Sequence, residues 1–215
     1  FHEGQWVKSP EIHRPRIVVT GMGMVTPLGN DVKTTWEALK AGRNGIVTFD
    51  MVQVAERAHT PRLSNMTHEV TVAGITNVNV REELGNFFSD KFVKSLEWND
   101  YAYSTELALL STVQALSQAG LLIQDGIADS VDKSRFGAVV GTMIGGLGYL
   151  PNVYQKILDR DPTNRVKPSD TFISDPSRVA SVPSRSFHAQ GPVYEVSAAC
   201  ASGSIAIISA ANEIV

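Results

Sequence analysis

Cysteine is almost absent from this sequence: Cys200 is the only one among 215 residues. A single cysteine cannot form a disulfide within the chain, and it cannot supply the thiolate cluster of a structural zinc site. This usage is typical of a reducing compartment, so we expect a cytoplasmic protein without a bound metal.

Long apolar runs and a strong excess of either charge are also missing. No uninterrupted apolar stretch reaches about 18 residues, and the first six residues lack the basic and then apolar pattern of a signal peptide, so no membrane span is expected. Lys and Arg number 19 against 22 Asp and Glu, a net charge of −3, with no basic stripe that would meet nucleic acid. The hydrophobic share of 43% is enough for a sizeable core. The composition indicates a globular protein or part of one.

The N-terminal region contains one strand signal and one helix signal. Residues 1–14 have little periodicity and are predicted to form a tail. The β-branched run at 16–20, stopped by two glycines, predicts a buried strand. A turn is expected at 26–30, followed by a helix with Asn30 or Asp31 as its N-cap and a glycine at its end.

The middle of the chain is less regular. Residues 45–90 predict an irregular excursion with one strand at 69–74. Apolar residues at helical spacing over 99–119 predict a helix, which Asn99 or Asp100 would cap and a glycine would end.

The C-terminal part alternates strand and helix signals, which predicts an α/β fold with a layered sheet. The expected elements are an acidic loop at 124–132, a buried strand at 135–141, a glycine-rich loop at 142–148, a helix around 153–158, a loop at 161–176, a helix at 177–187 that Pro183 breaks or kinks, a strand at 192–196 and a helix after Cys200. Because the last helix is apolar nearly all round, we expect it to be buried on every side.

Cys200 falls where a strand gives way to this last helix. If the sulfur lies in the first helical turn, unpaired backbone N–H groups and the helix macrodipole favour the thiolate, and the same N–H groups can donate to an oxyanion on a thioester carbonyl. Its neighbours are small residues, which leaves room for a substrate. The alternative is that the cysteine is a small buried hydrophobe.

Three segments resemble one enzyme family, the β-ketoacyl-acyl-carrier-protein synthases, and the elongating type most closely. They are RIVVTGMGMVTPLGN at 16–30, RFGAVVGTMIGGLG at 135–148 and GPVYEVSAACASG at 191–203. The resemblance implies a thiolase-like, layered α/β/α fold built from two similar halves, with residues 15–215 forming the first half.

The resemblance also implies a reaction, a decarboxylative Claisen condensation in fatty-acid or polyketide synthesis. Cys200 would hold the acyl group as a thioester, its own N–H would be one oxyanion donor, and Ile144 and Gly145 would line the acyl pocket. No cofactor is implied. The implied partners are an acyl carrier protein, acyl and malonyl thioesters, a second subunit (homodimer or ketosynthase-like heterodimer), and a C-terminal half that supplies two histidines and a lysine.

The sequence departs from the family pattern at two places. Residues 167–176 are polar where elongating synthases resemble one another in an apolar, phenylalanine-containing stretch, and Pro183 interrupts an expected packed helix. No histidine matches the family's catalytic pair, so surface or loop positions are expected for His2, His13, His59, His68 and His188.

Three other functions compete with condensation. A non-catalytic partner subunit would shape the pocket of an active synthase, and a thiolase would act on coenzyme-A thioesters. A nucleotide-binding module would use Gly21 and Gly23, although the third glycine of that motif is missing. The glycine-rich stretch 145–148 lacks the Lys-Ser/Thr ending of a phosphate loop, which favours a close backbone turn.

Overall fold

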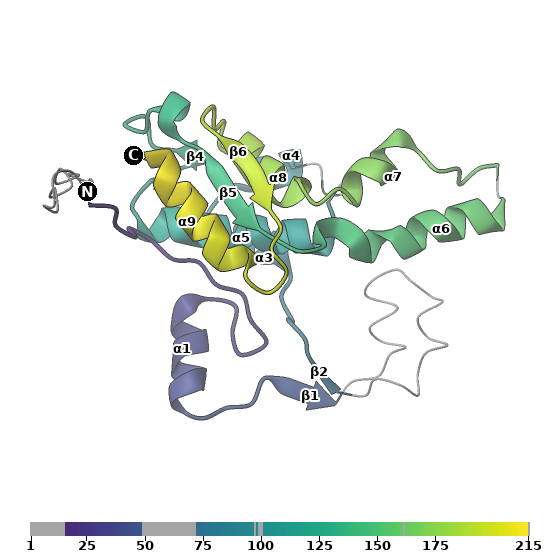
Figure 1. Cartoon of the computed structure of the whole chain (residues 1–215), viewed down its shortest axis with the longest axis horizontal. Helices are drawn as coiled ribbons and strands as arrows, with labels where there is room; N and C mark the ends of the chain where they lie inside the picture. Colours follow the sequence, from purple (N-terminus) through teal and green to yellow (C-terminus); the bar gives the residue numbers. More distant parts are fainter. Residues whose placement is uncertain (1–15, 49–71, 97, 99–100, 161, 215) are drawn as a thin grey trace, which may run out of the picture.

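Two parallel strands form the centre of the fold. The computed structural model describes residues 16–48, 72–96, 98, 101–160 and 162–214. Strand β5 (Ala138–Gly141) pairs with β6 (Val193–Val196), with Ala138 opposite Val193 and Gly141 opposite Val196. Helix α9 (Ser202–Ile214) lies on the near face of this pair in Figure 1, and α8 (Arg178–Ser186) and α5 (Tyr103–Gln118) lie behind it. The predicted α/β layering and both strands are confirmed.

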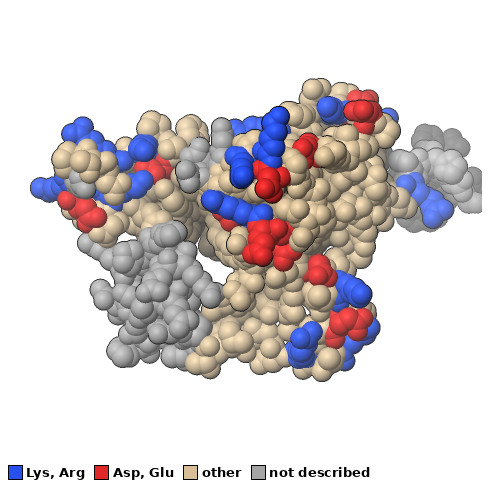
Figure 2. Space-filling view, turned by 180° about the vertical axis from the view of Figure 1, so that it is seen from behind, with Lys and Arg blue, Asp and Glu red and all other residues tan. Residues whose placement is uncertain are grey.

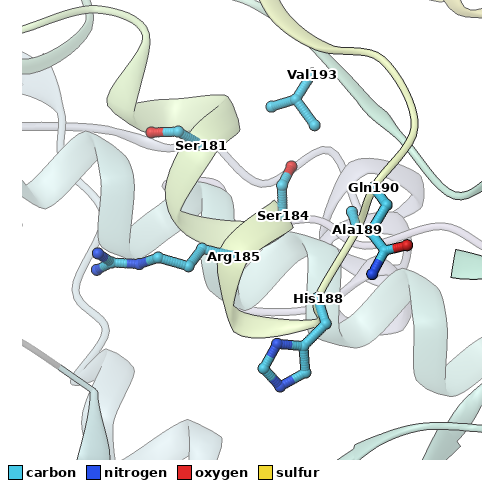
Figure 3. A pocket seen from close by; sticks show the side chains of 7 residues that line it. All are labelled: Ser181, Ser184, Arg185, His188, Ala189, Gln190 and Val193. Carbon is cyan, nitrogen blue, oxygen red and sulfur yellow. The ribbon is translucent and has the colours of Figure 1, made fainter. Parts of the chain in front are cut away.

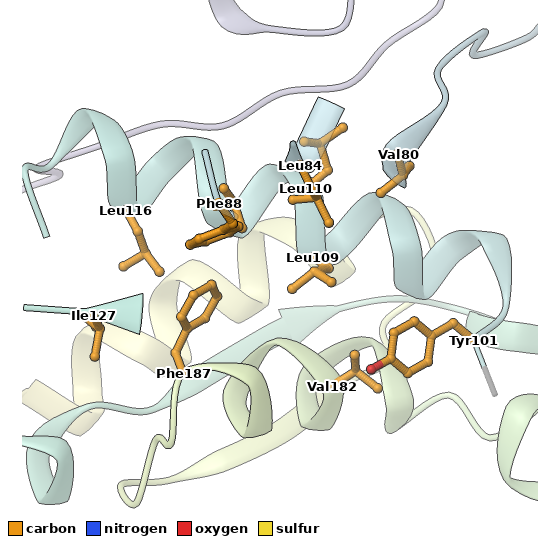
Figure 4. Close-up of a cluster of buried hydrophobic side chains, with 11 residues drawn as sticks. Val80, Leu84, Phe88, Tyr101, Leu109, Leu110, Leu116, Ile127, Val182 and Phe187 are labelled. Atoms are coloured by element: carbon orange, nitrogen blue, oxygen red, sulfur yellow. The ribbon is translucent and has the colours of Figure 1, made fainter. Parts of the chain in front are cut away.

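The hydrophobic core lies between α5, α8 and the short helix α3 (Val80–Leu84). Figure 4 shows side chains from these elements converging, with the Phe88 and Phe187 rings 6.1 Å apart. The helical spacing seen in the sequence supplies the α5 members of the core, which are Leu109, Leu110, Val113 and Leu116. The predicted helix is therefore confirmed, but it begins later, at Tyr103, and its N-cap residue Ala102 makes no side-chain hydrogen bond to it. Asn99 and Asp100 lie outside the described residues.

The predicted strand at 16–20 is wrong. These residues are extended but exposed, and no strand among the described residues pairs with them. The next residues lie on α5, where Met22 N donates to Gln118 Oε1 at 2.6 Å and Met24 N donates to Gln114 Oε1 at 2.8 Å. A β-branched run becomes a strand only where a neighbouring strand takes up its backbone groups.

The two glycines in this segment are explained by its close approach to α5. A Cβ on Gly21 would lie 3.0 Å from Ala119 N, and one on Gly23 would lie 2.7 Å from the Ser111 carbonyl carbon. Backbone therefore rests directly on helix backbone here, as only glycine allows. This packing accounts for the glycines that suggested a nucleotide loop.

The first helix, α1 (Val32–Lys40), follows its sequence signals. Asp31 is the N-cap, with its Oδ1 accepting from Thr34 N at 2.8 Å, and Gly42 follows with a φ of 64°. Strand β1 (Ile46–Thr48) pairs antiparallel with β2 (Val72–Gly74), which confirms part of the strand predicted at 69–74; residues 69–71 lie outside the described residues, as does the tail at 1–14.

Several short elements were not predicted from the sequence. They are α3, α4 (Asp90–Ser95), the hairpin of β3 (Leu122–Ile123) with β4 (Gly126–Ile127), and the 3-10 helix η3 (Lys133–Arg135). Asn79 and Ser89 cap α3 and α4 with their side chains. Elements of two to six residues carry too little periodicity for a sequence pattern to reveal.

The region after β5 is more helical than predicted. The 3-10 helix η4 (Gly145–Tyr149) leads into α6 (Leu150–Asp159), and α7 (Pro168–Ile173) occupies part of the predicted loop at 161–176. Pro168 stands at the first helical position, where its missing N–H costs nothing. Helix α8 continues through the buried Pro183, and Ser184 Oγ donates to the Ala180 carbonyl at 2.7 Å in the same turn.

The surface is mixed in charge and locally apolar. On the face in Figure 2, basic and acidic side chains lie beside one another rather than in separate patches. Helix α9 is not buried on every side as expected: Ile207 and Ile208 are 71% and 55% exposed, while Ser202 and Ala206 are buried. None of the helices in the described ranges is long and apolar enough to cross a membrane.

Candidate active site at the carboxyl edge of the sheet

Two loops leave the same edge of the sheet, because β5 and β6 are parallel. The pairing extends one residue past the strands, where Thr142 N donates to the Val196 carbonyl at 3.1 Å. Beyond this point the segment after β5 continues into the loop 144–146. The segment after β6 forms the turn 197–201, which we call the Cys200 turn. The tertiary structure thus brings Ile144, Gly145 and Cys200 to one edge, and ligands of open α/β sheets bind outside this carboxyl end of the strands.

The Cys200 turn is tight and braced by a serine. Ala199 has a left-handed φ of 48°, and Ala201 N donates back to the Ala198 carbonyl at 3.0 Å. Ser202 is 4% exposed, and its hydroxyl accepts from Ala198 N at 2.8 Å and donates to the Ala199 carbonyl at 2.6 Å. These bonds hold the turn with Cys200 exposed at its surface.

Two expectations about Cys200 change as a result. The side chain is exposed and forms no disulfide, so it is not a small buried hydrophobe. It also lies two residues before the first helical residue, Ser202, and not within the first turn of α9. The helix begins later than predicted because left-handed Ala199 and the Ser202 hydroxyl complete a separate turn first.

The N-terminus of α9 points its amides toward this turn. The first helical bond of the α type runs from Ile205 N to the Ala201 carbonyl at 3.0 Å, so the preceding amides have no carbonyl one turn back. Ser202 N donates instead to the Ala199 carbonyl at 3.2 Å. The amides of Gly203 and Ser204 are the remaining first-turn donors, and with the helix macrodipole they favour negative charge at this end.

The backbone of β5 fixes where α9 begins. A Cβ on Gly141, the last residue of β5, would lie 2.6 Å from Gly203 N and closer still to the Ser202 carbonyl. The strand and the helix N-terminus therefore meet backbone to backbone. The sequence showed the glycine but not the contact that requires it.

The loop 144–146 is a close turn held from several sides. Gly145 has a φ of 46°, its N–H donates to Thr142 Oγ1 at 3.0 Å, and its carbonyl accepts from Ser104 Oγ of α5 at 2.9 Å. A Cβ on Gly145 would lie 2.9 Å from Pro176 Cβ. This packing agrees with the expected backbone turn, and the Ile144 side chain remains 50% exposed.

Sequence reasoning missed a buried charged group beside this loop, the Asp170 cluster of Asp170, Tyr149 and Lys156. Asp170 is 2% exposed; its Oδ1 accepts from Tyr149 Oη at 2.9 Å and from Lys156 Nζ at 2.8 Å, and its Oδ2 accepts from Lys167 N at 2.7 Å. A signal existed: a proline at the first helical position with an acid two residues later is typical of a helix start.

Two groups of the cluster, Asp170 and Lys156, are ionised at neutral pH. Burial raises the pKa of Asp170, but hydrogen bonds from Lys156, Lys167 and Tyr149 outweigh it and hold the pKa below its ordinary value. The hydrogen bond to Asp170 raises the pKa of Lys156, and burial followed by the same carboxylate raises the pKa of Tyr149. At neutral pH the group is a carboxylate, an ammonium and a neutral phenol.

The pocket in Figure 3 lies at the opposite edge of the sheet. It has a volume of about 430 Å³, and it is lined by the end of α8 and the start of β6, with Ser181, Ser184, Arg185, His188, Ala189, Gln190 and Val193 around it. Cys200 follows the other end of β6. His188, in a left-handed loop position, is the one histidine within the described ranges; His2, His13, His59 and His68 lie outside them.

Comparison with known proteins gives a consistent result. The family model described as "Beta-ketoacyl synthase, N-terminal domain" matches residues 14–215. A 3-oxoacyl-[acyl-carrier-protein] synthase 2 of Staphylococcus aureus (strain N315) is 31% identical over 192 residues, which cover 89% of this chain and 40% of that protein. The chain thus spans about two fifths of that curated relative.

Solved structures agree on the fold. A β-ketoacyl synthase from Burkholderia phymatum STM815 matches with a TM-score of 0.67 at 23% identity, covering 92% of this chain and 43% of that one. AntDE:AntF, described as a type II polyketide acyl-carrier protein in complex with its ketosynthase bound to the hexaketide, matches with a TM-score of 0.59 at 20% identity, covering 92% and 41%. The predicted thiolase-like α/β fold is confirmed.

Proposed function

The chain belongs to the β-ketoacyl synthase family, whose N-terminal domain it carries, and from this premise we propose that Cys200 is the acyl-accepting nucleophile of a β-ketoacyl-acyl-carrier-protein synthase. The observation that carries the proposal is the Cys200 turn. It holds an exposed, free thiol at the carboxyl edge of parallel strands, directly before the N-terminus of a helix. A nucleophile of this kind needs access for its substrate and donors for the oxyanion that forms on attack.

The proposed reaction has two stages. In the first, the Cys200 sulfur attacks the carbonyl carbon of an acyl thioester, the N–H of Cys200 and the amides at the start of α9 stabilise the oxyanion, and the carrier thiol leaves with a proton. In the second, a malonyl thioester loses carbon dioxide, and the electron pair of the broken bond attacks the Cys200 thioester. The new carbon–carbon bond releases the Cys200 sulfur and leaves a β-ketoacyl group on the carrier.

The second stage needs residues beyond this chain. Two histidines and a lysine for decarboxylation are expected from the family resemblance, and His188 lies at the other end of β6 from Cys200. We therefore propose that residues 15–215 form the first of two similar halves, and that this chain alone accepts an acyl group without completing condensation. Ile144 and Gly145, at the same edge as Cys200, are proposed to line the acyl pocket.

The proposed partners are an acyl carrier protein and its acyl and malonyl thioesters, in fatty-acid or polyketide synthesis. A complex of a ketosynthase with its acyl-carrier protein among the structural matches supports the carrier as partner. We also propose a dimer, either of identical subunits or with a ketosynthase-like subunit, and a cytoplasmic location, which suits the single cysteine.

Intact-mass measurement tests the nucleophile. The chain joined to its C-terminal half is incubated with acyl carrier protein that carries an acyl group as a thioester. Wild type is expected to gain one acyl group, whereas Cys200→Ala gains none. An adduct that survives Cys200→Ala, or no adduct on wild type, would overturn the assignment. Ser204→Ala, at an exposed serine of the same helix, is the matched control and is expected to be acylated.

Adding malonyl-carrier protein tests the reaction class. The acylated wild-type protein is expected to lose its adduct and form a β-ketoacyl carrier with release of carbon dioxide. A stable adduct with no product would contradict condensation and favour a non-catalytic partner subunit. Faster acylation of Cys200 by an acyl-coenzyme A thioester than by the acyl thioester of the carrier protein would contradict the proposed substrate and favour a thiolase.

A further inference from the structure

The Asp170 cluster ties together three consecutive elements, the first of which, η4, begins within the loop 144–146. Tyr149 ends η4, Lys156 lies on α6, and Asp170 lies on α7. The side chain of Asp170 reaches both of the others, at 2.9 Å and 2.8 Å. One carboxylate therefore decides how α7 packs on the segment that follows the loop.

The position of α7 is passed to the loop by direct backbone contact. A Cβ on Gly146 would lie 3.1 Å from Ser174 Cα, and one on Gly145 would lie 2.9 Å from Pro176 Cβ. Ser174 and Pro176 directly follow α7, and Ile173 at its end is 2% exposed. Because Ser104 of α5 holds the Gly145 carbonyl as well, the loop is clamped between α5 and the end of α7.

In the ion pair of this cluster the carboxylate is buried and the ammonium is partly buried, unlike the other ion pair among the described residues. The Asp170 and Lys156 side chains are 3% and 19% exposed, whereas Lys40 and Glu37 on α1 are 51% and 57% exposed. A buried charge that loses its partner is far more costly than an exposed one, so the two pairs differ in how strongly they hold their elements. The polar stretch 167–176 thus contains an electrostatic clamp.

We propose that Asp170 is a positioning residue that holds the loop 144–146 in place and thereby limits which acyl chain lengths reach Cys200. This inference rests on the proposed function, because it takes the loop as part of the acyl site. Asp170 acts through α7 and touches neither the substrate nor Cys200. Its loss leaves the chemistry of the nucleophile intact and loosens one wall of the site.

The first test compares acyl-length selectivity in the full-length protein. Asp170→Asn keeps the shape of the side chain, removes its charge, and turns an NH₂ group toward at least one of three donors. With short, medium and long straight-chain acyl-carrier thioesters, the spread of kcat/KM between the best and worst substrate is expected to narrow by about tenfold. The best substrate is expected to acylate Cys200 in Asp170→Asn as fully as in wild type.

Four further variants separate positioning from general damage. Glu37→Gln removes the exposed ion pair on α1 and is expected to leave the selectivity unchanged. Lys156→Gln is expected to narrow it, and the double variant Asp170→Asn/Lys156→Gln is expected to add little, because both changes break one unit. Tyr149→Phe removes a single hydrogen bond and is expected to produce a smaller narrowing, and it serves as the test if Asp170→Asn does not fold.

Hydrogen exchange gives a readout that does not depend on activity. Amides of residues 142–149 are expected to exchange faster in Asp170→Asn than in wild type, while those of α1 are unchanged. The proposal is overturned if the folded variants keep the wild-type selectivity, or if every acyl donor loses rate equally. If wild type acquires no acyl group at all, the proposed function fails and the selectivity claim falls with it, whereas a normal wild type with unaltered variants contradicts Asp170 alone.

Discussion

The contact between Gly141 and the start of α9 leads to a sharp prediction for Gly141→Ala. The added methyl carbon would lie 2.6 Å from Gly203 N, whereas ordinary contact begins near 3.4 Å, so the N-terminus of α9 must move away by about 1 Å. Gly203 N and the neighbouring Ser202 carbonyl are backbone atoms and cannot rotate aside as a side chain would. Overpacking of this kind costs about 1–3 kcal/mol, which is the expected loss in free energy of unfolding.

The same displacement should slow acylation of Cys200. The amides at the start of α9 are the proposed oxyanion donors, and a shift of about 1 Å at a reacting centre lowers rates by roughly 100-fold. Urea denaturation measures the stability, and time-resolved intact mass measures the acylation rate of the protein that remains folded.

Two glycine variants control for the added methyl group. Gly203→Ala places a methyl group on the same helix end, where no atom lies within 4 Å, so its free energy of unfolding should be unchanged or higher by up to about 1 kcal/mol. Gly126→Ala, equally open and remote in the β3–β4 hairpin, should acylate at the wild-type rate. If Gly141→Ala matches these controls in both measurements, the reasoning about the backbone contact is refuted.

Three other predictions follow from contacts near the site and the core. Ser202→Ala removes two hydrogen bonds from the Cys200 turn and leaves Ala198 N without its acceptor. Urea denaturation should therefore show that the free energy of unfolding falls by about 1–3 kcal/mol, whereas Ser204→Ala should stay near wild type. Equal losses in both variants would contradict the bracing role of Ser202. Gly23→Ala places a methyl carbon 2.7 Å from the Ser111 carbonyl carbon, so a thermal melt should show a loss of stability of about 1–3 kcal/mol. An unchanged melting temperature would show that the segment around Gly23 does not need its close packing on α5. The stability difference between wild type and Asp170→Asn should be constant near neutral pH and shrink as the pH falls below 3.8. Because the folded-state pKa of Asp170 is lowered, its contribution to stability is present above the ordinary pKa and is lost as the pH falls through the folded-state pKa. A stability difference that grew with acid in urea titrations would contradict this sign.

Local signals were enough for the elements whose evidence lies within a few residues. The Asp31 cap and the glycine after α1, the apolar spacing of α5, and the β-branched runs of β5 and β6 all predicted what the structure contains. The segment around Cys200 predicted a strand followed by a helix, and it carried the family resemblance. Each of these depends on backbone preferences that operate over one turn or one strand.

The failures arose where distant residues decide the outcome. The run at 16–20 has the composition of a strand but no neighbour among the described strands, and the next residues bind the side chains of α5 instead. Pro183 did not break α8, because the helix is held in the core on both sides of it, with Val182 and Phe187 buried. The helix α7 was missed because the charge that holds it comes from Lys156, fourteen residues earlier.

The sequence by itself determined the family and the α/β class and singled out Cys200 as the proposed nucleophile, because a short motif and periodic patterns carry that information. Only the tertiary structure decided that Cys200 precedes its helix, that it shares an edge with the loop 144–146, and that a buried carboxylate holds the loop's neighbour. The physical reason is that these properties depend on which backbones approach each other and which charges lose water together. Both are settled by packing between residues far apart in the chain.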